Sequence, residues 1–193
     1  MKRLALLLLT ATLVLAQSGP FSSIQTIPFD SARSVSTADI NKDNITDLLV
    51  TNYNNETVSI LLGSGGTFSQ ASGSPFAMGP KPIRAVAGDF NKDNRIDIAV
   101  LHEAALFPVS GGFQSAPAVS VYFGTPSGFS LAPGSPMRLQ GDAASELILR
   151  DVNLDGNIDI LAVTSTPNVV LSDGAGNFSS PIVAPTAEER GVR

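Results

Sequence analysis

The sequence predicts an all-β fold assembled from repeated units. Of its 193 residues, 17 are Gly and 13 are Pro, which disfavours long helices and favours many short strands joined by turns. The chain is 43% hydrophobic and only 15% charged, so it has the apolar side chains that a packed core needs. A nine-residue pattern rich in Asp and Asn occurs three times, and similar strand-like segments follow each copy.

Composition excludes several kinds of site and partner. With no Cys, the chain has neither disulfides nor a thiolate zinc site, and its single histidine, His102, rules out a two-histidine metal motif. We interpret His102 as a solvated loop residue rather than a general base, because the sequence places no nucleophile near it. The net charge of −5 and the scattered Lys and Arg argue against a nucleic-acid partner. We find no enzymatic motif and expect a protein that is not an enzyme.

The first 16 residues are typical of a secretory signal peptide. Lys2 and Arg3 precede an apolar run over residues 4–15, and the small residue Ala16 marks the cleavage site. As a helix this run spans about 18 Å, too short for a hydrocarbon core of roughly 30 Å. We therefore expect a mature chain of residues 17–193 with no membrane span, located outside the cell or in the periplasm.

Each repeat contains its elements in the same order. The Asp-rich pattern is followed by an apolar segment that we predict to be a buried strand, then by a second strand and a Phe-Ser pair. The first predicted strands are residues 48–50, 98–100 and 160–163. The second are residues 58–62, 119–123 and 169–171. The Phe-Ser pairs are residues 68–69, 129–130 and 178–179, and a fourth pair, residues 21–22, precedes the first pattern.

The spacing of these units is typical of propeller blades. Successive Phe-Ser pairs lie 47, 61 and 49 residues apart, and periods of this size with four strand-like segments fit blades better than helical repeats. We predict a β-propeller-like fold of about three four-stranded blades after the signal peptide. Their approximate bounds are residues 31–80, 81–140 and 141–187. Because propellers need at least four blades to close, we expect an incomplete propeller: a fragment, or a chain that associates with further blades or with itself.

The middle unit contains an insertion, which we place within residues 101–118. Phe107 and Phe113 lie there among Gly, Pro and Ser residues. We expect a disordered loop whose phenylalanines cover a blade edge, and the alternative is a docking site for a partner.

The Asp-rich patterns are predicted calcium sites. Side-chain oxygens at positions 1, 3, 5 and 9, with the carbonyl at position 7, supply the hard ligands that calcium prefers. Position 6 needs a sharp turn that Gly156 adopts freely and that Asn44 and Asn94 tolerate. Polar turns that need no ion are the alternative. Nine of the 17 acidic residues crowd into these patterns, however, which favours a neutralising cation.

The sequence contains the pattern D-x-N-x-D-[GN]-x-x-D, followed by an apolar strand, by V-S-[IV]-[LY]-[LF]-G and by a Gly-rich turn that leads to Phe-Ser. This series of motifs resembles the FG-GAP and VCBS repeats of integrin α-chain-type β-propellers. The resemblance covers nearly all of residues 21–193. It implies one blade per unit and about three calcium ions, each in the loop between the first two strands. The implied ligands are Asp39, Asn41, Asp43, Ile45 and Asp47; Asp89, Asn91, Asp93, Arg95 and Asp97; and Asp151, Asn153, Asp155, Asn157 and Asp159, with the position-7 residues binding through their carbonyls.

These observations predict a secreted, calcium-stabilised module for binding, adhesion or scaffolding. Its ligand would be a protein or a carbohydrate that the sequence does not identify. The alternative is the accessory propeller portion of an exported hydrolase that cleaves polysaccharides or phospholipids, with its catalytic domain outside this sequence.

Overall fold

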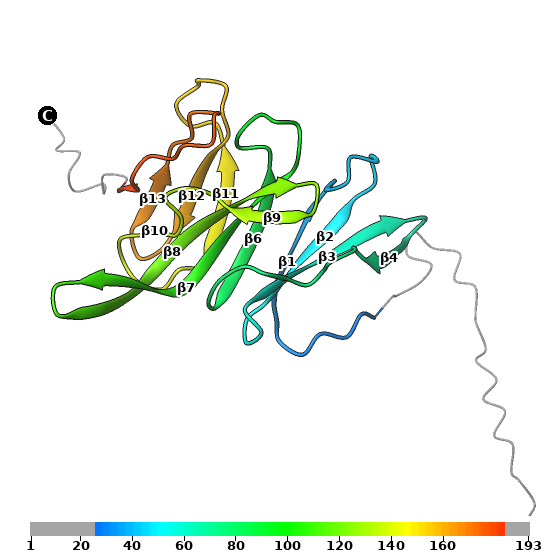
Figure 1. Ribbon diagram of the computed structural model, residues 1–193, viewed down its shortest axis with the longest axis horizontal. Helices are drawn as coiled ribbons and strands as arrows, with labels where there is room; N and C mark the ends of the chain where they lie inside the picture. Colours follow the sequence, from blue (N-terminus) through cyan, green and yellow to red (C-terminus); the bar gives the residue numbers. More distant parts are fainter. Residues whose placement is uncertain (1–25, 184–193) are drawn as a thin grey trace, which may run out of the picture.

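The computed structural model describes residues 26–183, and every regular element in that part of the chain is a β-strand (Figure 1). The strands form three antiparallel sheets. Within these residues no helix has the length and apolar character needed to cross a membrane. The predicted signal peptide and the Phe-Ser pair at residues 21–22 lie outside the described residues.

The sheets follow one another along the chain. The first runs in the order β1 (Ala32–Ala38), β2 (Asp47–Asn52), β3 (Thr57–Ser64) and β4 (Thr67–Gln70), with β5 (Phe76–Ala77) also paired to β3. The second runs in the order β6 (Pro82–Gly88), β7 (Asp97–Val109), β8 (Gly112–Thr125) and β10 (Met137–Arg138), with β9 (Gly128–Leu131) also paired to β8. The third runs in the order β11 (Glu146–Arg150), β12 (Asp159–Val163), β13 (Pro167–Val170) and β14 (Ile182–Val183).

The outermost strand of the first two sheets is divided into two pieces. In the first sheet β4 and β5 pair with different parts of β3, and Oγ of Ser74 between them accepts the N–H of Ile60 at 2.9 Å. In the second sheet, Oγ of Ser135 accepts the N–H of Val121 at 3.0 Å. Each of these sheets therefore has four strand positions, as predicted, with a serine filling the gap in the fourth.

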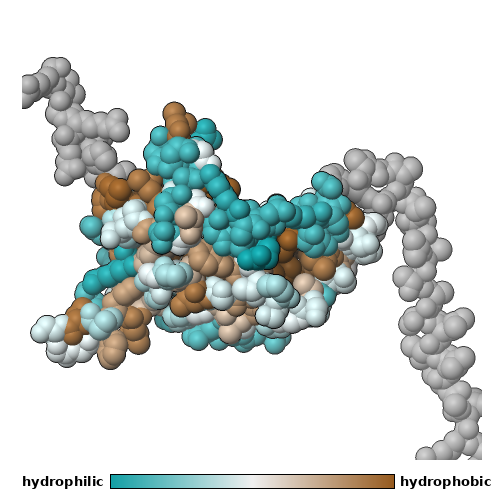
Figure 2. Space-filling view, turned by 45° about the horizontal axis from the view of Figure 1, so that its top comes forward, coloured by the Kyte–Doolittle hydropathy of each residue, from teal (hydrophilic) through white to brown (hydrophobic). Residues whose placement is uncertain are grey.

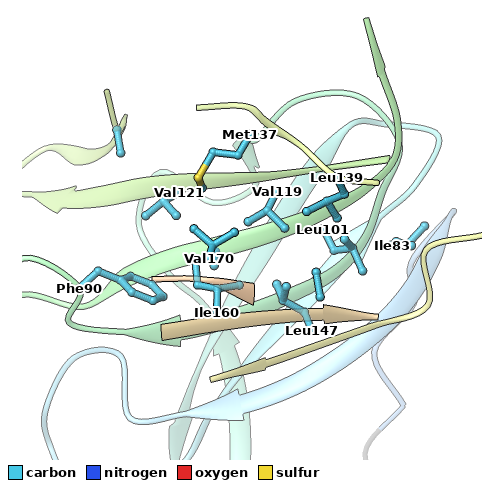
Figure 3. Close-up of a cluster of buried hydrophobic side chains, with 13 residues drawn as sticks. Ile83, Phe90, Leu101, Val119, Val121, Met137, Leu139, Leu147, Ile160 and Val170 are labelled. Atoms are coloured by element: carbon cyan, nitrogen blue, oxygen red, sulfur yellow. The ribbon is translucent and has the colours of Figure 1, made fainter. Parts of the chain in front are cut away.

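Apolar side chains fill the spaces between neighbouring sheets. Between the second and third sheets, Leu101, Val119 and Val121 meet Leu147, Ile160 and Val170 (Figure 3). A second cluster joins the first two sheets through Leu49, Val58, Ile60, Ala85, Ile98 and Val100. Because alternate residues of a strand face opposite sides, the middle sheet is buried on both faces. This explains the continuous apolar run over residues 98–100, which is fully buried as predicted.

The inner strands β1, β6 and β11 lie next to one another, so the sheets spread as an open fan over the described residues (Figure 1). Oγ of Ser36 on β1 donates to the carbonyl of Ala85 on β6 at 2.5 Å. The guanidinium of Arg84 on β6 pairs with the carboxylate of Glu146 on β11, with Nε 2.7 Å from Oε1. These contacts link each inner strand to the next, in addition to the apolar packing between the sheets.

The insertion is an ordered hairpin, so the prediction of a disordered loop is wrong. β7 and β8 extend beyond the sheet and remain paired up to Val109 and Gly112. Backbone hydrogen bonds between the two strands order the insertion, and Arg138 donates a further one to the side chain of Gln114. The Phe107 ring lies 5.9 Å from the guanidinium carbon of Arg138, whereas Phe113 is exposed.

The prediction that His102 is a solvated loop residue is also wrong. His102 lies on β7 and is fully buried. Its Nδ1 is 2.7 Å from the carbonyl oxygen of Pro80 and must donate to it, so Nε2, 2.9 Å from Oγ of Ser120, accepts. Burial lowers the pKa of His102 to about 4, and the ring is therefore neutral at pH 7.

Candidate metal centres

Three loops with the Asp-rich pattern lie along one edge of the fan. We call them loop 1 (residues 39–47), loop 2 (residues 89–97) and loop 3 (residues 151–159). They lead from β1 to β2, from β6 to β7 and from β11 to β12, at the upper edge in Figure 1. Figure 2 turns this edge toward the reader and shows hydrophilic surface along much of it.

Left-handed residues give each loop its shape. Position 6 has positive φ in all three loops, at Asn44 (65°), Asn94 (67°) and Gly156 (83°), which confirms the prediction for this position. Position 4 is also left-handed, at Lys42, Lys92 and Leu154. This second turn was not predictable, because neither Lys nor Leu favours the left-handed conformation.

The two turns bring positions 1, 3 and 5 together. In loop 1 the carboxylate of Asp39 accepts the backbone N–H groups of Asp43 (3.0 Å) and Asn44 (2.8 Å). Oδ1 of Asn41 accepts the same Asp43 N–H at 3.1 Å, and Oδ1 of Asp43 accepts the N–H of Ile45 at 2.7 Å. The corresponding atoms form the same four hydrogen bonds in loops 2 and 3.

The aspartate at position 9 is fully buried and anchors the loop to the sheet. Oδ2 of Asp97 accepts the N–H of Phe90 at position 2 (2.9 Å), and Oδ1 accepts the N–H of Gly124 near the end of β8 (2.8 Å). Asp47 and Asp159 make the equivalent pairs of bonds. Gly124 permits this close approach, because a Cβ there would lie 2.4 Å from the carbonyl oxygen of Ile96. Sequence reasoning assigned position 9 to the ion and missed this anchoring role.

The electrostatic surroundings differ between the loops. In loop 2, Arg95 at position 7 forms an ion pair with Asp93. Within the described part of the chain, no carboxylate of loop 1 or loop 3 forms an ion pair. In loop 3 the N–H of Asn157 and the amide of Asn153 hold the pKa of Asp155 below its usual value. Burial raises the pKa of Asp97, and this effect exceeds the lowering by the two backbone N–H groups that donate to its charged form.

The residues present fit a calcium ion by their chemistry. Each loop brings together two carboxylates and an amide oxygen, all hard ligands, with the position-9 carboxylate at its base. Over residues 26–183, however, no three His, Cys, Asp or Glu side chains approach closely enough to form a metal site. To bind an ion, the side-chain oxygens at positions 1, 3 and 5 would have to turn toward it and away from the backbone N–H groups that now donate to them. The predicted ligands thus lie in three separate loops, with positions 1, 3 and 5 clustered.

A second buried polar cluster in each sheet was not predicted. Five residues after the position-9 aspartate stand Asn52, His102 and Thr164. Each is buried and hydrogen-bonded to a polar residue of the next strand, namely Ser59, Ser120 and Asn168 respectively. The constant offset is the signal that could have identified them.

Part of the chain matches a known family. The model of the FG-GAP-like repeat matches residues 39–100, a segment that begins with loop 1, includes loop 2 and ends in β7. No curated protein matches the chain.

Proposed function

We propose that this FG-GAP-type repeat protein is a calcium-stabilised, β-propeller-like module that acts by binding rather than by catalysis. The observation that carries the proposal is the recurrence of one loop in all three sheets, with the same acidic positions and the same hydrogen bonds. Each loop holds two carboxylates near its surface and a third buried at its base, and a divalent cation would relieve the repulsion between them.

Each ion would be held within a single loop. The side chains at positions 1, 3, 5 and 9 and the carbonyl at position 7 would bind it, and the ion would supply charge neutralisation and a link across the turn. Helical calcium-binding loops use a bidentate Glu at position 12. In the three described loops this position lies within a strand and holds Val50, Val100 and Ala162 instead. We therefore expect the weak affinity of extracellular modules, with Kd on the order of 10⁻⁴ to 10⁻³ M.

Chelation tests this role. At 10 mM calcium, binding of that strength stabilises the folded state by about 1.4 to 2.7 kcal/mol per site. We expect the unfolding temperature in calcium to exceed that in EDTA by at least several degrees, and magnesium at the same concentration to have a smaller effect. Equal unfolding temperatures in calcium and EDTA would contradict the proposal.

The structure indicates which carboxylates to change. Asp151→Asn with Asp155→Asn removes one half-buried and one exposed charge from loop 3 and leaves the buried Asp159 and its hydrogen bonds intact. We expect a small loss of stability in EDTA, because Asn keeps only one of the two oxygens with which Asp151 accepts backbone N–H groups of the loop, and about two thirds of the wild-type gain in calcium. Asp173→Asn is the matched control, because Asp173 is an exposed aspartate in a turn of the same sheet outside the loops. A full calcium gain in the double variant would exclude loop 3 as a site.

We also propose export followed by removal of residues 1–16. The basic pair, the apolar run and Ala16 support this, and weak calcium sites suit an extracellular medium. N-terminal sequencing of the protein recovered outside the cytoplasm should begin at Gln17. A protein that keeps Met1 and stays in the cytoplasm would overturn this part of the proposal.

Binding rather than catalysis is supported by the surroundings of the only histidine. His102 is neutral, fully buried and engaged at both ring nitrogens. It therefore has neither access to a substrate nor a free nitrogen for proton transfer.

A further inference from the structure

We propose that a pocket between the first two sheets binds a small molecule that has an apolar body and one carboxylate. The pocket lies beside loops 1 and 2, where the fan of sheets opens away from the inner strands (Figure 1). Its volume of about 370 Å³ falls within the range of roughly 300 to 1,000 Å³ that is typical of ligand sites. The proposal concerns the apolar space between the sheets, and it does not depend on the calcium role.

The gap between the second and third sheets shows how side chains can fill this space. Phe90 at position 2 of loop 2, Phe123 near the end of β8 and Phe178 of the third Phe-Ser pair pack together. The ring centroid of Phe178 lies 5.9 Å from that of Phe90 and 6.4 Å from that of Phe123. Phe90 is only 1% exposed. Three aromatic rings therefore occupy the space beside loop 2 in this gap.

In the gap between the first two sheets, smaller side chains replace two of these rings. Ile40 stands at position 2 of loop 1, where loop 2 has Phe90. Leu62 is the equivalent of Phe123, because each precedes the glycine whose N–H donates to the position-9 aspartate. The same scaffold therefore encloses less side-chain volume here.

The third ring leaves the remaining space open. Phe129 is the equivalent of Phe178, and it packs edge-on against Phe76 with the ring centroids 5.0 Å apart. The wall of the pocket thus consists of half-buried apolar side chains, which a bound apolar group would remove from water. They are Ile40, Leu62, Ala71, Phe76, Ile96 and Phe129.

The mouth of the pocket carries a cation that is available to a ligand. Lys42 and Arg95 both line the pocket and are exposed, but Arg95 already pairs with Asp93. Nζ of Lys42 donates only to neutral acceptors, namely the carbonyl oxygen (2.7 Å) and Oδ1 (2.6 Å) of Asn94. Over residues 26–183 no carboxylate forms an ion pair with Lys42. An ammonium group has three donors, so one N–H of Lys42 remains for an anionic group.

This combination of wall and mouth selects the class of ligand. An apolar body fits against the aliphatic and aromatic wall, and a carboxylate at the mouth would pair with Lys42. The chain has a net charge of −5, so a carboxylate has no general attraction to it. Preference for an anionic over a neutral molecule of the same shape would therefore come from this site.

Binding of 2-naphthoate, which joins one carboxylate to two fused rings, tests the proposal. Equilibrium dialysis against the purified full chain in EDTA measures it without any contribution from calcium. We expect saturable binding with Kd on the order of 10⁻³ M. The neutral 2-naphthalenemethanol should bind about two- to five-fold more weakly, because it cannot form the ion pair.

Filling the pocket should abolish binding. Ile40→Phe with Leu62→Phe introduces the residues that stand at the equivalent positions of the next gap, Phe90 and Phe123. We expect at least a ten-fold weaker affinity for 2-naphthoate, with circular dichroism like that of the wild type. Leu106→Phe on the β7–β8 hairpin, an exposed apolar residue outside the pocket, is the control and should bind like the wild type.

Removing the charge at the mouth tests the carboxylate contact, even if the filled variant does not fold. Lys42→Gln should weaken binding of 2-naphthoate about two- to five-fold and leave binding of 2-naphthalenemethanol unchanged. Lys92→Gln is the matched control, because Lys92 stands at the same left-handed position of loop 2 but does not line the pocket.

Three results would overturn the proposal. The first is the absence of saturable 2-naphthoate binding up to about 10 mM. The second is equal affinity of the wild type for the acid and the alcohol, which would indicate a site for neutral apolar groups. The third is unchanged 2-naphthoate binding in Lys42→Gln or in a folded Ile40→Phe with Leu62→Phe variant. Because every measurement is made in EDTA, failure of the calcium proposal would leave these results interpretable.

Discussion

Each Asp-rich loop divides its carboxylates between two roles. Asp47, Asp97 and Asp159 are buried, and each joins its loop to the end of the third strand position through backbone N–H groups. The aspartates at positions 1 and 5 hold the loop closed near the surface, where a cation can reach them. Substitutions at position 9 therefore change the anchoring of the loop as well as a proposed ligand, whereas substitutions at positions 1 and 5 test the ion more directly.

Arg95 should weaken calcium binding in loop 2. Its guanidinium pairs with Asp93, one of the proposed ligands, and thus competes with the ion. Arg95→Asn reproduces position 7 of loop 3, and since exposed ion pairs contribute about 0.2 to 1 kcal/mol, the affinity of loop 2 should rise by up to roughly five-fold. Calcium titration measures this, with Lys81→Asn as a control for the loss of one positive charge away from the loops. An unchanged or lower affinity in Arg95→Asn would show that the pair does not compete.

His102 should make stability depend on pH. Its pKa is about 4 in the folded chain and about 6.5 when unfolded, so between these values the unfolded state binds more protons. Stability should then fall as the pH drops from 6.5 to 4, by up to about 3 kcal/mol from this group. His102→Asn, which copies the Asn52–Ser59 pair of the first sheet, should remove this contribution. Urea unfolding of both proteins at pH 7, 5.5 and 4.5 measures it, and parallel pH profiles would contradict the assignment.

At the scale of elements, the strands were predictable and the insertion was not. The runs over residues 48–50, 98–100 and 160–163 lie in β2, β7 and β12, because apolar runs this short, preceded by turn residues, are typical of buried strands. In the insertion, Gly, Pro and Ser suggested a loop. The long pairing of β7 with β8 overrides that local preference, because hydrogen bonds between the two strands continue to the end of the hairpin.

The tip of the β7–β8 hairpin should be dispensable for folding. Replacing residues 106–115 by Asn-Gly joins Ala105 to Ala116, which are paired across the hairpin, and removes Phe107 and the exposed Phe113. The contact of Phe107 with Arg138 is at the surface, so its loss should cost about 1 kcal/mol or less. Urea unfolding measures this cost, and an unfolded or strongly destabilised variant would show that the tip is part of the core.

At the scale of the whole molecule, periodicity predicted three repeated sheets, and packing decided what single residues do within them. The match to the FG-GAP-like repeat falls on residues 39–100, where loops 1 and 2 agree best in sequence. The partners of His102 were not predictable, because Pro80 and Ser120 are distant from it in sequence. The anchoring by position 9 was hidden for the same reason, since its partner Gly124 lies 27 residues beyond Asp97.

The central claim is that the three loops exist to bind calcium. Equilibrium dialysis of the purified chain at saturating calcium, with bound calcium measured per chain, tests it most directly. Our account predicts three ions for the wild type, two for Asp151→Asn with Asp155→Asn, and three for Asp173→Asn. Fewer than one ion per wild-type chain would show that the loops are polar turns closed by their own hydrogen bonds.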